Sequence, residues 1–379
     1  DYFHSTFFLI LLLCISSPSL CFPTFLYNEK YILTKRNNRR KERPKQLLNL
    51  TGKDIMVNET ISRIANSTGM DNIFIVTNVT QAELMKQETR IAPDHILAEP
   101  AARNTAACIG YAAMEIVKKY EDGIMCILPS DSYIRDTEEY TKVINAAIEA
   151  AETTDKLVTI GIKPTFAATG YGYIRGKKET GAVIGETGKK YVDVEEFVEK
   201  PDEDTAKVYL ADGNYTWNSG MFIWKASTIL KKFESLLPDI YAYLVEIGKA
   251  MGTEQEQEVL NRVYPVIPKI SIDYGIMERC RDVITLEGDF GWNDIGSLDM
   301  LTVTKNADDE GNVLYGEQVN LDTKNCIIYG TDKLIATIGL EDLIIVQAKD
   351  AVLVCPKERA QDVKKIVDEL QQEGKEQYL

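Results

Sequence analysis

Two aspartates stand in segments that could hold a hard metal ion. Asp131 follows a buried apolar run in "LPSDS", and Asp294 lies in the Gly-, Trp- and Asn-rich turn "FGWNDIGS". A carboxylate just beyond a buried strand can hold Mg²⁺ over a nucleotide's phosphates, and Mg²⁺ takes one or two carboxylates plus phosphate oxygens. The structural alternatives are a helix cap for Asp131 and a plain loop for Asp294. With two histidines in the chain, a histidine-based metal site or triad is excluded.

Four further segments carry groups suited to a sugar or a phosphate. Gly172 in "GYGYI" lets the backbone approach a sugar closely. In "VEEFVEKP", Glu199 could accept hydrogen bonds from hydroxyls and Lys200 could meet a phosphate. Asn218 in "WNSGMFIW" and Asp273 in "SIDYGIME" could each bind a hydroxyl group. Each segment also has a structural interpretation as a hairpin turn, a solvated strand end, a chain turn or a helix cap.

Alternating strands and helices must position these residues. From about residue 70, apolar runs at 72–77, 123–131 and 156–162 predict strands, and helical patterns at 104–120 and 138–152 lie between them. Such alternation implies right-handed βαβ units in a mixed, mainly parallel sheet covered on both faces, a doubly wound Rossmann-like α/β fold. Ligands of such sheets bind beyond the carboxyl ends of the strands, where Asp131 is expected.

The C-terminal part has a different pattern. Short β runs follow one another between residues 325 and 356 with no helix between them. This predicts a small all-β unit over residues 305–379, either a flat sheet or a coiled solenoid, with an amphipathic helix at 357–372.

The composition of the chain limits the classes of molecule that it is expected to bind. A net charge of -15 and a pI near 4.8 argue against nucleic acid as a partner, because a phosphate backbone requires clustered Lys and Arg. The seven cysteines form no C-x-x-C pair and favour reduced thiols in the cytoplasm. No membrane partner is expected. The sequence does not fix the oligomeric state, and a homodimer is compatible with it.

The N-terminus differs from this picture. Residues 7–22, "FFLILLLCISSPSLCF", form an apolar run that is too short to span a bilayer and resembles the hydrophobic core of a signal peptide. A basic stretch follows, with seven Lys and Arg between residues 35 and 45. An exported or lipid-anchored protein is therefore an alternative that rests on residues 7–22 alone.

The order and wording of the motifs resemble the mannose-1-phosphate guanylyltransferases over about nine-tenths of the chain. The shared segments, in order, are "AEPAARNTAA", "LPSD", "TGYGYI", "FVEKP", "NSGMF", "SIDYGIME" and "GWNDIGS". The tail resembles the left-handed β-helix portion of the short form of these enzymes. The resemblance implies transfer of GMP from GTP to α-D-mannose 1-phosphate, which yields GDP-mannose and diphosphate with Mg²⁺ as cofactor.

The resemblance also implies residue roles. Asp131 and Asp294 would hold Mg²⁺, Lys45 would contact nucleotide phosphates, and Lys200 the sugar phosphate. The mannose pocket would be lined by Gly172, Glu199, Asn218 and Asp273. The guanine end would be recognised by Glu99, Pro100, Arg103, Asn104 and Thr105.

One part of the family pattern is missing. The family begins with a strand and a glycine-rich phosphate loop, G-G-x-G-T/S-R-x-x-P-x-S-R, but here only "RKERPKQ" matches its end and no glycine precedes Gly52. We therefore expect 39–304 to be the nucleotidyltransferase domain and 1–38 to be foreign, through a frame error, a mis-assigned start or a recombined end. A divergent N-terminus is the alternative. Ser132 also departs from the family, which often has His there.

Two other functions fit the same residues. One is a nucleotidyltransferase for another sugar or base, which a sugar-phosphate panel would distinguish. The other is a non-catalytic homologue that binds sugar phosphate but, without the glycine loop, does not activate GTP.

Overall fold

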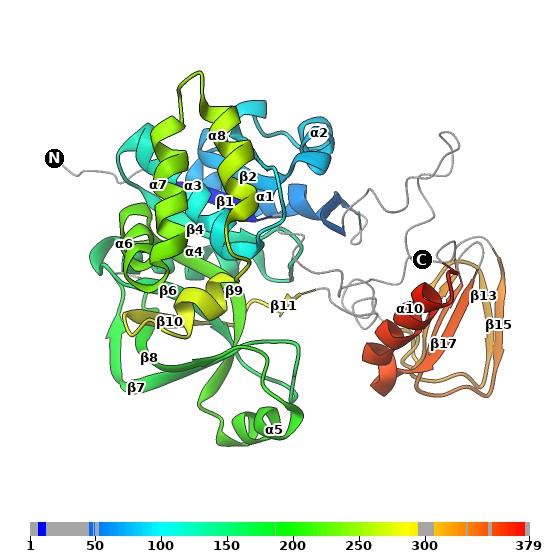
Figure 1. Ribbon diagram of the computed structural model, residues 1–379. Coiled ribbons are helices and arrows are strands. Elements are labelled where there is room, and N and C mark those ends of the chain that lie inside the picture. The colour runs from blue at the N-terminus through cyan, green and yellow to red at the C-terminus, as the bar shows by residue number, and fades with distance from the viewer. Residues whose placement is uncertain are drawn as a thin grey trace. The chain divides into compact units, whose positions relative to one another are not determined.

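The computed structural model describes residues 7–12, 45–47, 49, 53–185, 187–294, 307–330, 333–347 and 351–375. They belong to two compact units, which are described separately (Figure 1). The first unit contains β1 (Phe7–Leu12) and the chain from Val57 to Trp292, and the second contains the described residues between 45 and 56 and those from Asn293 onward.

The first unit is built on a nine-stranded mixed sheet with the order β3-β2-β1-β4-β9-β6-β10-β8-β7. After β1, its strands are β2 (Ile73–Asn78), β3 (Ile96–Glu99), β4 (Ile124–Pro129), β6 (Leu157–Ile162), β7 (Tyr173–Val183), β8 (Lys190–Val198), β9 (Tyr215–Lys225) and β10 (Val283–Gly288). Within this sheet, β8 and β9 are antiparallel to their neighbours and the other strands point one way. The predicted mixed, mainly parallel sheet is confirmed.

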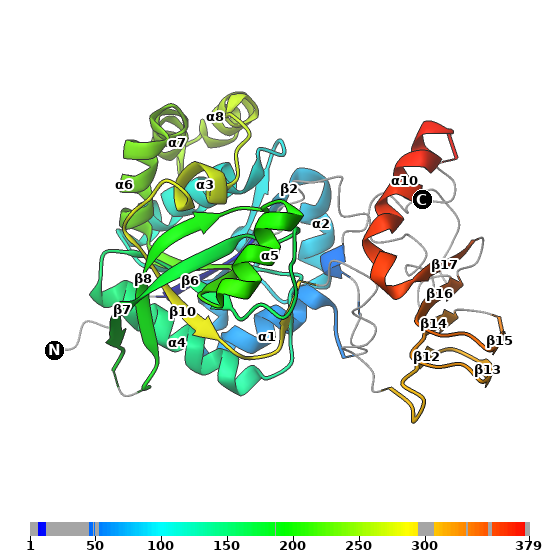
Figure 2. The same ribbon diagram turned by 90° about the horizontal axis from the view of Figure 1, so that it is seen from below.

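Helices cover both faces of this sheet (Figure 2). The α-helices are α1 (Met56–Thr68), α2 (Val79–Glu88), α3 (Asn104–Tyr120), α4 (Thr137–Thr153), α5 (Glu203–Asp212), α6 (Ala226–Leu236), α7 (Pro238–Ala250) and α8 (Glu256–Val263). Along β4, Met125 and Ile127 join the core formed with α3, α6 and α7, whereas Cys126 lies near Tyr140 of α4. This alternation follows from the pleat of the strand, and it explains why β4 is apolar on both faces.

Close packing joins the helices on one face. A Cβ atom on Gly110 of α3 would lie 2.3 Å from Leu244 Cδ1 of α7, so only glycine allows the two helices to approach this closely. The remaining short elements of the unit are η3 (Met70–Asn72), η4 (Pro93–His95), η5 (Tyr264–Val266), the π-helical turn η6 (Asp273–Met277), β5 (Tyr133–Ile134) and β11 (Trp292–Asn293).

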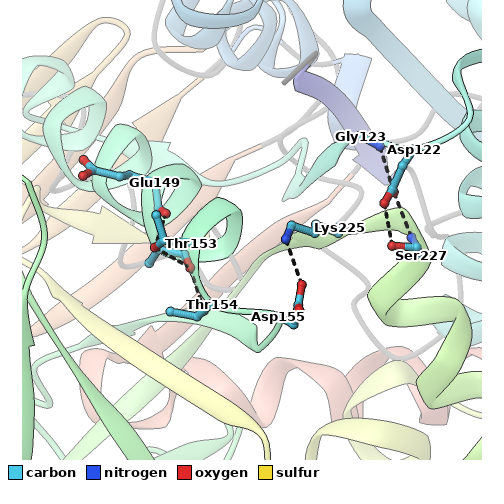
Figure 3. Close-up of polar contacts among 9 residues, drawn as sticks. Asp122, Gly123, Glu149, Thr153, Thr154, Asp155, Lys225 and Ser227 are labelled. Atoms are coloured by element: carbon cyan, nitrogen blue, oxygen red, sulfur yellow. Dashed lines mark hydrogen bonds and ion pairs between the residues drawn. The ribbon is translucent and has the colours of Figure 1, made fainter. Parts of the chain in front are cut away.

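Polar contacts fix the sheet at the end of β4 away from Asp131 (Figure 3). The Asp122 carboxylate accepts hydrogen bonds from the backbone N–H groups of Gly123 (2.8 Å) and Ser227 (3.0 Å), and Ser227 Oγ donates to it at 2.5 Å. These bonds satisfy free donors at the first turn of α6. They hold the entry to β4 and the start of α6 together.

Strand β1 lies inside the central sheet, a position that the sequence analysis did not predict. It pairs in parallel with both β2 and β4, with Leu9 opposite Ile73 and Cys126. A buried parallel strand and the core of a signal peptide share one pattern, a short unbroken apolar run, so composition alone does not separate them. The rest of residues 1–38 and the basic stretch up to residue 44 lie outside the described residues.

The second unit is a solenoid, as one of the two alternatives predicted. Its strands are β12 (Val313–Tyr315), β13 (Gln318–Leu321), β14 (Ile327–Gly330), β15 (Ile335–Ile338), β16 (Leu343–Gln347) and β17 (Val352–Pro356). Successive turns stack in register, so that Val313, Ile327 and Ile344 form one parallel ladder around an apolar core. The expected closing helix begins as the 3-10 helix η8 (Lys357–Asp362) and continues as α10 (Val363–Gln372).

Candidate functional site

The predicted sugar-side residues gather at the edge of the sheet where the parallel strands end. Because β9 runs against β6, Asn218 near the start of β9 lies opposite Gly161, close to the end of β6. The register between β6 and β9 shifts at this point, between Thr159 and Gly161. A β-bulge of this kind re-aims a side chain, and here Asn218 Oδ1 accepts from Gly220 N at 3.1 Å.

Gly172 lies directly against two of the other predicted residues. Its carbonyl accepts a hydrogen bond of 2.8 Å from Asn218 N. A Cβ atom built on Gly172 would lie 2.4 Å from Glu199 Oε2 and 3.2 Å from Asn218 Cβ. The glycine predicted for close approach therefore leaves room for the Glu199 carboxylate.

Glu199 and Asp273 form an electrostatically coupled pair of carboxyl groups. Burial and then the charge of Asp273 raise the pKa of Glu199 to about 7, while Lys200 acts in the opposite direction. Burial also raises the pKa of Asp273, against hydrogen bonds that lower it, including one of 3.0 Å from Asn218 Nδ2. Glu199 Oε2 is buried and has no hydrogen-bond partner among the described residues. An unfilled acceptor in this position is suited to a ligand hydroxyl.

Lys200 is held at a tight corner beside this pair. Its backbone has a φ of 48°, a region that non-glycine residues rarely occupy, and its ammonium lies 3.2 Å from Glu199 Oε1. Glu278, at the end of "SIDYGIME", accepts a 2.8 Å hydrogen bond from Glu199 N and so fixes the corner. The sequence analysis did not predict this contact of Glu278 with Glu199. A residue with φ near 48° commonly marks a turn that the surrounding structure enforces.

The predicted guanine-side residues lie between β3 and α3. Glu99 ends β3 and is 3% exposed, and burial raises its pKa to about 7 although Tyr264 donates a hydrogen bond to its Oε1. Pro100 follows in a bend. Arg103 occupies the N-cap position of α3 without a capping hydrogen bond from its side chain, and its Nε is buried and without a partner in the described part of the chain. Tyr264, which orients Glu99, was not predicted, because it is distant in sequence and lies in no motif.

The guanine-side and sugar-side segments are joined by hydrogen bonds. Asn104 begins α3 with a φ of 68° and its Oδ1 accepts from Thr105 N at 2.7 Å. Thr105 Oγ1 in turn accepts from Ile272 N at 2.8 Å, next to Asp273. The start of α3 and the "SIDYGIME" segment therefore hold each other in place.

The two predicted metal ligands flank a pair of hydrogen-bonded strands. Asp131 lies two residues before β5, and Asp294 follows β11 directly. β5 and β11 form a two-stranded sheet, beside which Arg135 N donates to Phe290 O at 3.1 Å. Within the described residues, no group of three or more His, Cys, Asp and Glu is arranged to hold a metal ion. A donor set of two carboxylates fits Mg²⁺, which completes its shell with phosphate oxygens and water.

Two further residues bear on the phosphate side. Lys45 begins the short helix η2 (Lys45–Leu47), and its side chain lies outside the described residues. Arg63 of α1 donates from Nη2 to the carbonyl of Ser132 at 3.1 Å, directly beside Asp131. Sequence analysis did not identify Arg63, because a helical arginine between apolar positions has no distinguishing pattern.

Comparison with known proteins shows that two family models together match most of the chain. Residues 40–311 match the nucleotidyl transferase family, and residues 316–370 match the MannoseP isomerase/GMP-like beta-helix domain. In the described residues, no helix is both long and apolar enough to cross a lipid bilayer.

Curated relatives match most of the chain. The xanthan biosynthesis protein XanB of Xanthomonas campestris pv. campestris (strain B100) is 39% identical over 339 residues, which cover 88% of this chain and 69% of XanB. The mannose-1-phosphate guanylyltransferase ManC of Salmonella typhimurium (strain LT2) is 35% identical over 342 residues, which cover 88% of this chain and 70% of ManC. The mannose-1-phosphate guanylyltransferase of Escherichia coli (strain K12) is 36% identical over 346 residues, with 88% and 70% covered.

Solved structures show a similar fold. The crystal structure described as mannose-1-phosphate geranyltransferase from Thermus thermophilus has a TM-score of 0.79 and 29% identity, with 97% of this chain and 99% of that chain covered. The crystal structure of mannose-6-phosphate isomerase from Helicobacter pylori has a TM-score of 0.57 at 21% identity, with 76% and 99% covered, and it bears on the fold alone.

Proposed function

The chain belongs to the nucleotidyl transferase family, and from this premise we propose that it transfers GMP from GTP to α-D-mannose 1-phosphate. A phosphate oxygen of the sugar phosphate attacks the α-phosphorus of GTP, so that a new P–O bond forms. The bond between the α-phosphorus and the departing diphosphate breaks, and GDP-mannose and diphosphate result. No protein nucleophile is required, so the side chains act by positioning and by electrostatics.

The observation that carries this proposal is the cluster of Gly172, Glu199, Asn218 and Asp273 around one unfilled acceptor. Four separate segments supply these residues, and Glu199 Oε2 is buried beside the Gly172 backbone without a partner among the described residues. Such an arrangement suits a ligand with several hydroxyl groups. The relatives named mannose-1-phosphate guanylyltransferase support mannose as the sugar.

Lys200 and the guanine-side residues would complete substrate binding. Lys200 is exposed over about half of its side chain beside the sugar-side cluster, and it would meet the sugar phosphate. Glu99, at the end of β3, and the start of α3 at Arg103–Thr105 would face the base. Lys45 would hold nucleotide phosphates.

Asp131 and Asp294 would hold Mg²⁺. Each aspartate is close in sequence to a strand of the β5–β11 pair, Asp131 two residues before β5 and Asp294 directly after β11. When bound, Mg²⁺ supplies positive charge that offsets the charge on the reacting phosphates. The hydrogen bond from the Arg63 side chain to the backbone carbonyl of Ser132 fixes the turn that carries Asp131.

We also propose that the protein works in the cytoplasm. Cys126, Cys280 and Cys326 are free thiols, which fits a reducing compartment.

Product analysis with a substrate panel tests the proposed activity. The purified chain would be incubated with Mg²⁺, GTP and mannose 1-phosphate, and diphosphate and GDP-mannose would be quantified by chromatography. Parallel reactions would replace mannose 1-phosphate with glucose 1-phosphate, or GTP with ATP and UTP. We expect GTP and mannose 1-phosphate to be the preferred pair, with slow turnover because no glycine-rich phosphate loop precedes Gly52.

Each other result has a defined meaning. Preference for another pair would replace the substrate assignment within the same family. Calorimetric binding of mannose 1-phosphate without turnover would favour the non-catalytic alternative, in which the missing glycine loop prevents activation of GTP. The Asn218→Leu variant is the matched control, because it removes one sugar-side group and leaves the guanine-side residues intact.

A further inference from the structure

The ring of Tyr171 lies between two tryptophans that come from different parts of the chain. Its centroid is 5.1 Å from that of Trp217 in β9 and 5.3 Å from that of Trp292 in β11, with interplanar angles of 68° and 69°. Both are edge-to-face contacts, a geometry that contributes beyond simple burial of apolar area. Tyr171 is therefore in direct contact with segments that are 75 residues apart in the sequence (292 − 217).

Each of these three aromatic residues lies within two positions of a residue assigned to a substrate or to the metal. Tyr171 precedes Gly172, and Trp217 precedes Asn218, so both border the sugar-side cluster. Trp292 lies two residues before Asp294. The aromatic contacts therefore run from the sugar-side cluster to the segment that carries one metal ligand.

Each of the two tryptophans also carries an indole N–H group that can donate a hydrogen bond. The indole N–H groups of Trp217 and Trp292 are buried and have no hydrogen-bond partner among the described residues. Trp217 is 5% exposed, and Glu199 Oε2 nearby in the cluster is likewise unpartnered within the described part of the chain. Buried indole N–H groups usually donate to something, so unfilled donors here fit a ligand that brings oxygen atoms.

We propose that Tyr171 is a positioning residue that couples occupancy of the sugar pocket to the placement of Trp292 and of the β5–β11 pair next to Asp131. This inference rests on the proposed function, since it takes the sugar phosphate and Mg²⁺ as the two ligands. A sugar phosphate that packs against Gly172 and Asn218 restrains Tyr171 and Trp217, and the Tyr171 ring passes that restraint to Trp292. Mg²⁺ with its nucleotide and the sugar phosphate thus strengthen each other's binding, and by linkage the effect is reciprocal.

Phe166 provides a matched control from the same aromatic group. Its ring contacts Trp217 at 4.8 Å and Tyr171 at 6.4 Å, and it is 54% exposed. Among the described ring contacts it has none with Trp292. Loss of Phe166 therefore removes aromatic area at the sugar side without interrupting the contact with the metal-side segment.

Calorimetry measures this coupling without any turnover. Mannose 1-phosphate would be titrated into the protein with and without Mg²⁺ and a GTP analogue whose α,β-bridge is a methylene group. The coupling factor is the ratio of the two dissociation constants. We expect a clear coupling in the unmodified chain, reduced roughly two- to tenfold in Tyr171→Leu, the range typical of aromatic pairs. Tyr171→Phe, which keeps the ring, and Phe166→Leu should retain it.

A second variant on the other side of the contact keeps the test decisive if Tyr171→Leu does not fold. Trp292→Leu should lose the same coupling, and the double variant should lose no more than either single one, because both changes interrupt one contact. Unchanged coupling in Tyr171→Leu or Trp292→Leu would overturn the positioning role, as would binding of both ligands by the unmodified chain with no coupling. Failure of the unmodified chain to bind mannose 1-phosphate would overturn the proposed function itself, and with it this inference.

Discussion

Asn218 Nδ2 donates a hydrogen bond of 3.0 Å to Asp273 Oδ1, and this bond ties β9 to the π-helical turn η6. The two residues are 55 positions apart in the sequence. Burial raises the pKa of Asp273, and the hydrogen bond from the amide group of Asn218 acts against this by stabilising the carboxylate. π-Helical turns are frequent at functional sites, because the extra residue re-aims the side chains.

Gly172→Ala should weaken the binding of mannose 1-phosphate while the fold is retained. The added methyl group would lie 2.4 Å from Glu199 Oε2, so the flexible carboxylate must move out of the cluster. The neighbouring variant Gly170→Ala is the control, because a Cβ atom there meets no described atom within 4 Å. Isothermal titration with the sugar phosphate compares the two, and equal affinities would refute the assigned role of Gly172.

Binding of the sugar phosphate should strengthen as pH rises through 7. Burial and the charge of Asp273 raise the pKa of Glu199 to about 7, and only its ionised form accepts hydrogen bonds with both oxygens. The ionised fraction rises from about one-tenth at pH 6 to about nine-tenths at pH 8. KM for mannose 1-phosphate should therefore fall over this range.

Glu199→Gln is the control for that pH dependence. The phosphate of the ligand itself titrates near pH 6, and this contribution persists in the variant, whereas that of Glu199 disappears. The free energy of unfolding should change with pH in the opposite direction. The pKa of Glu199 in the folded protein, about 7, lies above its usual value of 4.5. The stabilising contribution of Glu199 is therefore complete below pH 4.5 and is lost as pH rises through about 7. Identical pH profiles for the two proteins would contradict the assignment.

Lys200→Ala should mainly weaken use of the sugar phosphate, with GTP binding close to normal. Lys200 ends the "FVEKP" segment and lies 3.2 Å from Glu199, on the sugar side of the cluster. A charge-assisted hydrogen bond contributes roughly 1.5–3 kcal/mol, or about 10- to 150-fold in affinity. Separate calorimetric titrations of the two substrates measure this, and selective loss of GTP binding would move Lys200 to the nucleotide side.

Asp131→Asn and Asp294→Asn should each abolish turnover without loss of the fold, in a form of the chain that carries a complete glycine loop. The two carboxylates flank the β5–β11 pair and would be the protein's ligands for Mg²⁺. Removal of this charge stabilisation typically costs several kcal/mol of barrier. Circular dichroism checks the fold. Near-normal Mg²⁺-dependent diphosphate release in either variant would disprove the metal assignment.

The chain with its present N-terminal sequence should turn over slowly or not at all. A triphosphate needs several converging backbone N–H groups, and the residues from Asn28 to Asn38, "NEKYILTKRNN", supply positive charge but no glycine. Replacement of residues 1–38 by a family-type strand and glycine loop should restore diphosphate release from GTP and mannose 1-phosphate. Equal, robust activity of both chains would mean that the present N-terminus is a working variant.

Much of the architecture was predictable from the sequence, because it depends on local pattern. Unbroken apolar runs such as 124–129 and 157–162 indicated buried parallel strands, and the β runs between 325 and 356 indicated a solenoid or sheet. The order of the motifs indicated the family, since their wording is specific even where each motif alone is common. The same local reasoning assigned Phe7–Leu12 to a foreign or signal-like segment, whereas the structure places it as β1 between β2 and β4.

The geometry of the site was decided only by the tertiary structure. The sequence contained Gly172, Glu199, Asn218 and Asp273 as separate candidates, but only the antiparallel run of β9 and its bulge bring them together. The pKa of Glu199 is likewise absent from the sequence, because it depends on burial and on a charge that lies 74 residues away along the chain (273 − 199). Tyr171 has no distinguishing pattern at all. Periodicity records which face of an element is buried, whereas the neighbours across that face are set by topology, and charge, hydrogen bonding and ring contact depend on those neighbours.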